Sequence, residues 1–152
     1  MKSIFLRYHG SFIASLIDNS PRAIEIARDL PEDNHLYSFN AKVGGYLTYS
    51  TKRMSPWTFT FQPKHVKTIS EQFEKFDDYY LILVCGFETT AVLNKEEVSV
   101  LLPLNEPITS SITIRTGHDK KLAVSGTCGE LKGKLSKTRT YERLLNSLNS
   151  SA

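Results

Sequence analysis

The fold of this chain is decided by residues 63–85, which read PKHVKTISEQFEKFDDYYLILVC. The first part predicts a helix that begins at Pro63, because its apolar residues recur every three or four positions and form one stripe. Residues 79–85 are apolar without alternation, which is typical of a central strand covered on both faces. The stripe consists of Val66, Ile69, Phe73 and Phe76.

The chain that follows continues in the same style. Gly86 ends the central strand, and residues 89–93 are expected to return beside it. Asn94 and Glu97 have the spacing of a capping box, which predicts a helix over residues 95–102. The remaining predicted elements are a hairpin of residues 111–115 and 121–125 across the turn 117–119, and a last helix over residues 138–148.

The segments before residue 63 are predicted from weaker patterns. Residues 3–16 alternate loosely and predict a hairpin that turns at His9-Gly10, with a helix from about Ser11 as the alternative. Pro21 follows residues that can cap a helix, and this helix should end before Pro31.

Three strands are expected next, over residues 35–42, 46–51 and 57–61. Gly44-Gly45 should turn the chain between the first two, so the three form a meander. The predicted fold class is therefore α+β, a mixed sheet with a three-strand meander, a central buried strand and flanking helices.

The length of 152 residues fits a single domain, predicted here over residues 1–148 with residues 149–152 frayed. The longest apolar run has seven residues, far below the roughly 20 that cross a bilayer. No export signal is visible, so we expect a cytoplasmic protein that does not bind membranes. Cys85 reads as a buried hydrophobe, and its pairing with Cys128 stays open.

Charge is distributed unevenly along the chain. Residues 1–112 hold 11 Lys/Arg and 13 Asp/Glu, whereas residues 113–152 hold 8 and 3, so the net charge of +3 comes from −2 and +5. An excess of cations at one end of a sequence suggests an anionic partner, which we predict to be DNA or RNA. A solvated tail would have the same composition.

Two basic segments are the predicted nucleic-acid contacts. The first is the connection that precedes residue 57, where adjacent cations and an indole suit a phosphate and a base. Packing of that indole in the core is the alternative. The second is the basic C-terminal segment, which suits phosphate contacts. The predicted binding residues are Lys52, Arg53, Trp57, Lys132, Lys134, Lys137 and Arg139.

The order helix, three strands, helix, central strand over residues 20–86 resembles the core of the PD-(D/E)XK restriction-endonuclease-like superfamily. That resemblance implies a nuclease fold in which acidic residues and a lysine hold Mg²⁺ and orient water. Lys42 and Lys52 are present, but residues 35–62 contain no Asp or Glu. We therefore expect nucleic-acid binding without catalytic carboxylates and without a cofactor, Mg²⁺ being needed only by a nuclease.

Two other functions are consistent with the sequence. A protein-interaction or regulatory module, or a homodimer, would use the surplus aromatic residues. A divergent nuclease would take its acids from the first helix. The four histidines are far apart in sequence, so zinc is not expected. The aromatic residues are Tyr37, Phe39, Tyr46, Tyr49 and Trp57, and the acids are Glu25, Asp29 and Glu32.

Overall fold

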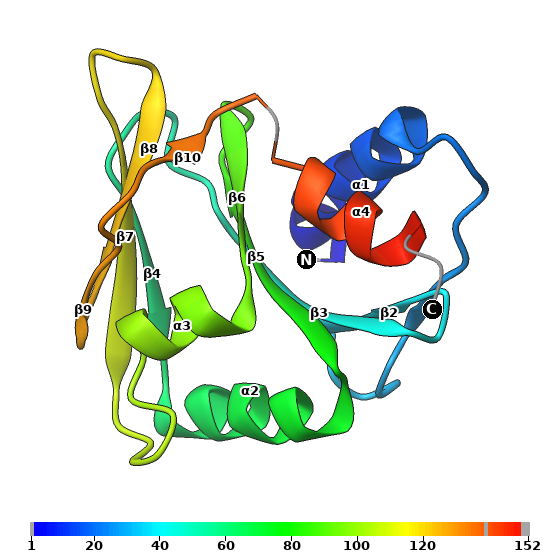
Figure 1. Cartoon of the computed structure of the whole chain (residues 1–152), viewed down its shortest axis with the longest axis horizontal. Helices are drawn as coiled ribbons and strands as arrows, with labels where there is room; N and C mark the ends of the chain where they lie inside the picture. Colours follow the sequence, from blue (N-terminus) through cyan, green and yellow to red (C-terminus); the bar gives the residue numbers. More distant parts are fainter. Residues whose placement is uncertain (1, 139, 150–152) are drawn as a thin grey trace.

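Figure 1 shows the chain as a computed structural model that describes residues 2–138 and 140–149. Helices separate runs of two to four mostly antiparallel strands along these residues, which confirms the α+β class. In chain order the elements are α1 (Lys2–Asn19), β1 (Ile26–Arg28), β2 (Leu36–Phe39), β3 (Val43–Ser50), β4 (Trp57–Phe61), α2 (Pro63–Lys75), β5 (Asp78–Cys85), β6 (Thr89–Leu93), α3 (Lys95–Leu101), β7 (Ser110–Thr116), β8 (Lys121–Gly126), β9 (Gly129–Glu130), β10 (Leu135–Ser136) and α4 (Glu142–Asn149).

The strands form two sheets that face each other. The first has the order β1-β2-β3-β5-β6 and is antiparallel except for β3 and β5, which run parallel. The second has the order β10-β8-β7-β4, with β9 added to β8. Helices α2 and α3 close the space between the sheets at one end, and α1 and α4 cover the outer face of the first sheet (Figure 1).

Two apolar cores lie on the two faces of the first sheet. One fills the space between the sheets, and the other lies under α1 and α4. Strand β5 contributes side chains to both cores. Leu81 and Leu83 lie in the first core, and Ile82 and Val84 lie in the second. This alternation of two buried faces confirms the predicted central strand, since a strand covered on both sides is apolar throughout.

The elements predicted from strong periodicity are present. Helix α2 starts at Pro63 and buries Val66 and Ile69 completely. The capping box at α3 forms both bonds, because Asn94 accepts from the Glu97 backbone N–H at 3.0 Å and Glu97 accepts from the Asn94 backbone N–H at 2.9 Å. Strands β6, β7 and β8 lie where the sequence places them.

The preferred predictions before residue 35 are wrong, although the alternative helix from about Ser11 lies within the observed helix α1. Residues 3–16 belong to helix α1, in which Tyr8, Phe12 and Leu16 recur every fourth position and are buried. That period is helical, and it outweighs the loose alternation on which the hairpin rested. The helix expected after Pro21 is absent from this described stretch, where the chain bends and then forms edge strand β1.

Gly44 and Gly45 do not turn the chain but lie inside β3. A Cβ at Gly44 would stand 2.5 Å from the ring of Phe76, so the strand needs glycine there to pass beneath aromatic side chains. The turn falls instead at Asn40 and Ala41, which both have positive φ, and the Lys42 N–H donates to the Phe39 carbonyl at 3.1 Å.

The predicted meander has the wrong third strand. Residues 57–61 form a strand with Trp57, Phe59 and Phe61 on one buried face, as expected, but β4 pairs with β7 in the second sheet. The antiparallel meander of the first sheet is β1-β2-β3. Neighbours in sequence are often neighbours in a sheet, and the 51–56 connection is an exception because it crosses to the facing sheet.

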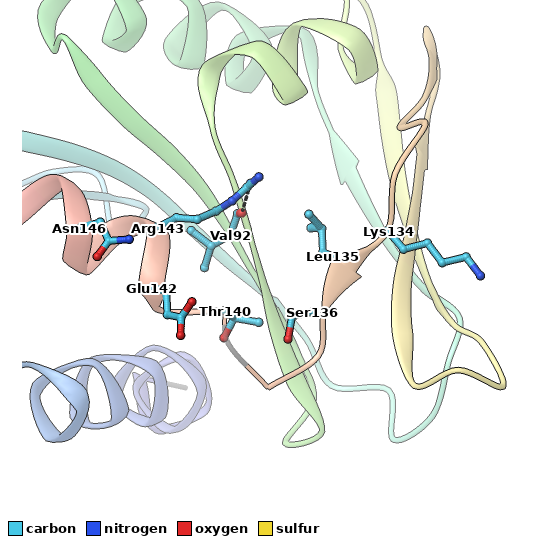
Figure 2. A pocket seen from close by; sticks show the side chains of 8 residues that line it. All are labelled: Val92, Lys134, Leu135, Ser136, Thr140, Glu142, Arg143 and Asn146. Carbon is cyan, nitrogen blue, oxygen red and sulfur yellow. Dashed lines mark hydrogen bonds between the residues drawn. The ribbon is translucent and has the colours of Figure 1, made fainter.

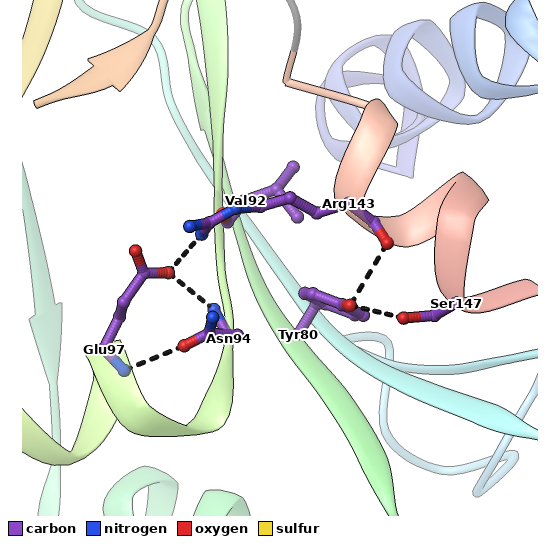
Figure 3. A network of polar contacts seen from close by, with 6 residues as sticks. All are labelled: Tyr80, Val92, Asn94, Glu97, Arg143 and Ser147. Atoms are coloured by element: carbon purple, nitrogen blue, oxygen red, sulfur yellow. Dashed lines mark hydrogen bonds and ion pairs between the residues drawn. The ribbon is translucent and has the colours of Figure 1, made fainter.

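Helix α4 is held against the rest of the protein by a polar network (Figure 3). Arg143 forms an ion pair with Glu97 of α3 and donates to the Val92 carbonyl of β6 at 3.2 Å. The Tyr80 hydroxyl donates to the Arg143 carbonyl, also at 3.2 Å. The helix starts at residue 142 rather than 138 and continues to Asn149. Residues 150–152, the rest of the predicted frayed end, lie outside the described residues.

Both cysteines are free thiols. Cys85 is buried at the end of β5, and burial raises the pKa of its thiol to about 12. Cys128 is exposed after β8. The pairing left open by the sequence is therefore not made.

Candidate nucleic-acid interface

Four connecting segments meet at one end of the molecule, along the upper edge of Figure 1. They are residues 51–56, 86–88, 117–121 and 134–138. The Gly86 N–H donates to the Ser50 carbonyl at 2.9 Å, and the Thr116 N–H donates to Ser55 Oγ at 2.8 Å. The Thr89 hydroxyl donates to the Lys137 carbonyl at 2.8 Å. We call this end the basic end, because of the charges described next.

The basic end carries six cations and two carboxylates. Both carboxylates are ion-paired, Asp119 with Lys134 and Glu88 with Lys137, each at 3.0 Å. The Lys134 ammonium donates to Asp119 and, with a backbone N–H, lowers the pKa of that carboxyl. The four segments therefore have a formal balance of +4. The cations are Lys52, Arg53, Lys120, Lys121, Lys134 and Lys137.

Parallel pairing explains why the first two segments meet. Strands β3 and β5 run in the same direction, so Ser50 and Cys85 lie at the same edge of the sheet. Gly86 then has φ +55°, and a Cβ there would stand 2.6 Å from the Lys52 carbonyl oxygen. Only glycine fits this approach without strain. The Trp57 indole N–H donates to the same carbonyl at 2.9 Å, so the backbone at Lys52 is held from two sides.

Phe87 is the exposed tip of a stack of aromatic rings at this end. Its side chain is 71% exposed, and its ring lies 4.7 Å from that of Tyr8 with an angle of 14° between the planes. Tyr8 is buried and stacks in turn on Tyr49 at 4.9 Å, with the planes parallel to within 1°. The stack holds the Phe87 ring in a fixed orientation while one side of it remains open to solvent.

Two clefts border Phe87. The first, of about 380 Å³, is lined by Tyr8, Phe87, Lys52 and Arg53, among others. The second, of about 310 Å³, also reaches Phe87 and contains Lys137. Hydroxyl groups dominate the second cleft and, apart from that of Thr89, which donates to the Lys137 carbonyl, can donate to phosphate or sugar oxygens. They belong to Ser11, Ser15, Thr89, Thr90, Thr138, Thr140 and Tyr141.

The structure brings together some of the predicted binding residues. Lys52, Arg53 and Lys137 border the turn at Phe87. Lys134 lies at the tip of the β7–β8 hairpin with Asp119. Lys132 is exposed and lies beside β8, away from the hairpin tip. Its position follows from the neighbouring Leu131, whose N–H donates to the Val124 carbonyl.

The structure contradicts the prediction for one binding residue and does not describe another. Trp57 is 1% exposed and packs in the core between the sheets, so it cannot stack on a base. Arg139 lies outside the described residues. The ring that sequence reasoning missed is Phe87, for which the available signal was an aromatic residue directly after a glycine that ends a buried strand.

A further cleft, of about 290 Å³, lies on the other side of residues 134–136, between β6, β10 and α4 (Figure 2). Figure 2 shows that the Lys134 side chain points away from this cleft. Its other cation, Arg143, is occupied by Glu97 and the Val92 carbonyl. This cleft thus adds little positive charge to the basic end.

Three histidines that are distant in sequence lie in a row beside the first sheet. The ring centroids of His9 and His35 are 6.5 Å apart, and those of His35 and His65 are 6.0 Å apart. His35 Nδ1 donates to the Leu47 carbonyl, whereas His65 Nδ1 accepts from the Gln62 N–H. In the described part of the chain, no group of three or more His, Cys, Asp or Glu side chains is placed to hold a metal ion.

We expect His9 to weaken the folded state in mild acid. Burial, reinforced by His35 and Arg28, lowers its pKa from 6.5 to about 4. Below pH 6.5 the His9 imidazole therefore binds a proton in the unfolded chain but stays neutral in the folded chain. The free energy of unfolding then falls by up to about 1.4 kcal/mol per pH unit until about pH 4. Urea unfolding should show a slope close to this value between about pH 6 and 5 and little pH dependence from His9 above about pH 7. The His9→Phe variant should show a flatter one, and equal slopes would contradict the assignment.

None of the acids proposed for a nuclease lines the cleft of Lys52, and one of them, Asp29, is bound by a different lysine. The Asp29 carboxylate is 8% exposed and is bound by Lys75 at 2.8 Å and by Gln72 at 2.9 Å. Glu25 and Glu32 are exposed on the neighbouring connections. Lys52 shares its cleft with Glu88, whose carboxylate is paired with Lys137.

Among the helices of the described residues, none is both long and apolar enough to cross a membrane. Comparison of the chain with protein-family models, with curated proteins and with solved structures gave no match. The likeness to the restriction-endonuclease-like core therefore stays a prediction.

Proposed function

We propose that the protein binds nucleic acid through the basic end. The observation that supports this most directly is that cations from three separate stretches of sequence, 52–53, 120–121 and 134–137, are folded onto one end. Lys and Arg side chains that converge in this way make contacts with successive phosphates, which provide most of the affinity for nucleic acid. The hydroxyl groups beside Lys137 add donors for the same backbone.

Acidic residues at the opposite end give the molecule a polarity that suits this function. Asp77, Asp78 and Glu96 line a cleft at the start of β5, together with Lys95. Strand β5 has eight residues, so roughly 25 Å separate this cleft from the basic end at 3.3 Å per residue. A polyanion is repelled by one end and attracted by the other, and this orients the encounter.

The alternative of an aromatic protein-interaction surface loses its motivation. Tyr37, Phe39, Tyr46 and Trp57 are between 1% and 6% exposed, so these rings fill the two cores. Tyr49 is half-buried in the stack beneath Phe87. The sequence contains more aromatic residues than one core needs because the fold has two apolar cores, and both contain aromatic rings.

A fluorescence-anisotropy titration against labelled DNA and RNA oligomers at increasing salt tests the proposal. About four to five phosphate contacts predict that log K falls against log salt with a slope of about −3 to −4. Absence of binding at about 50 mM salt, or an affinity that salt does not change, would contradict it.

A further inference from the structure

The geometry around Phe87 points to single-stranded nucleic acid as the ligand, an inference that depends on the proposed function and deepens it. Phe87 lies between the cleft of Lys52 and Arg53 and the cleft of Lys137. A strand whose phosphates contact these cations on both sides must pass over the ring. The open side of that ring is then placed against a base.

The face of a base is available to a protein only when the base is unstacked. In a duplex the faces are covered by neighbouring base pairs, and the grooves present base edges and phosphates. An aromatic ring that is 71% exposed can therefore use its face on a single strand, where base–ring stacking is tolerant of sequence. A basic surface without the ring would not distinguish the two forms.

The orientation of the Phe87 ring is set before any ligand binds. Tyr8 supports it from below, and Tyr49 supports Tyr8. Gly86, with φ +55°, places the ring at the tip of the turn. The Gly86 N–H donates to the Ser50 carbonyl and so anchors the backbone of this turn. A base added above Phe87 would continue a stack of three rings, so little side-chain ordering is needed on binding.

The test measures the binding of three labelled probes of about 15 nucleotides, oligodeoxyuridine, oligouridine and a DNA duplex, to the whole protein and to its variants. Wild type should bind the single strands more tightly than the duplex. Phe87→Ala should weaken single-strand binding by about 5- to 100-fold and leave duplex binding nearly unchanged. Phe87→Tyr, which retains an aromatic face, should bind like wild type. Thermal melting of each variant checks that it is folded. Replacement of the exposed Phe87 side chain should change the melting temperature little.

Each result separates this inference from the proposed function. Equal binding of strand and duplex, or a Phe87→Ala variant that binds single strands like wild type, would overturn the inference while nucleic-acid binding stands. Failure of all probes to bind would overturn both. Comparison of oligodeoxyuridine with oligouridine, which carry the same base, shows whether the strand is DNA or RNA, since only the 2′-hydroxyl distinguishes them.

Discussion

Replacement of Trp57 by alanine is expected to lower the free energy of unfolding by about 3–5 kcal/mol, the usual cost of removing a buried indole. Trp57 is 1% exposed and packs between the two sheets with residues of both. Its removal leaves a large cavity in the core and also frees the Lys52 carbonyl, to which the indole N–H donates at 2.9 Å. Urea unfolding followed by circular dichroism measures the effect.

The Trp57→Phe variant makes the cavity smaller but still removes the N–H donor. It keeps an aromatic ring in the core and loses part of the indole volume, so it should cost about 1–3 kcal/mol, less than Trp57→Ala. A variant Trp57→Ala that is as stable as wild type would show that the indole is not in the core. It would also restore the interpretation of Trp57 as a stacking residue, which the structure contradicts.

Charge reversal at the basic end should abolish most nucleic-acid affinity. The double variant Lys52→Glu/Arg53→Glu replaces two cations with two anions beside Phe87. This changes the local charge by four, and at about 0.1 M salt the expected loss is roughly 10²–10³-fold in the association constant. The same titrations used for wild type measure it, and the slope of log K against log salt should become shallower.

The matched control is Lys64→Glu/Lys67→Glu on the exposed face of α2. It changes the net charge of the protein by the same amount but at another surface. Its association constant should therefore fall only slightly, because distant charges are screened by salt. Both side chains in the test pair are exposed, and neither variant should change the melting temperature by much. An equal loss in test and control would indicate attraction by net charge instead of a site.

The accuracy of sequence reasoning followed the strength of the local pattern. Helix α2, strand β5 and the capped helix α3 were predicted because periodicity, an unbroken apolar run and a capping box each act within a few residues. Residues 3–16 were misread because two periods competed and only burial of Tyr8, Phe12 and Leu16 decides between them. The Gly44-Gly45 pair was misread because glycine serves a close approach as well as a turn.

The candidate site was predicted in part for a related reason. Lys52, Arg53 and Lys137 were selected from local charge, and charge is visible in a sequence. Whether a given ring is a core residue or a contact is not visible, because Trp57 and Phe87 differ only in what covers them. Trp57 was therefore selected in place of Phe87. Arg143, one of the eight Lys/Arg of residues 113–152, is bound to Glu97 and so does not contribute to the basic end.

The α+β class, the buried central strand and the excess of cations in the C-terminal third follow from the order of residues alone, since composition and periodicity are local properties of a chain. The crossing of β4 to the second sheet and the parallel pairing of β3 with β5 arise only when the chain folds. Folding also brings together around Phe87 residues as far apart in sequence as Tyr8 and Lys137. Such pairings depend on which apolar faces bury one another, and that selection is made by the whole fold.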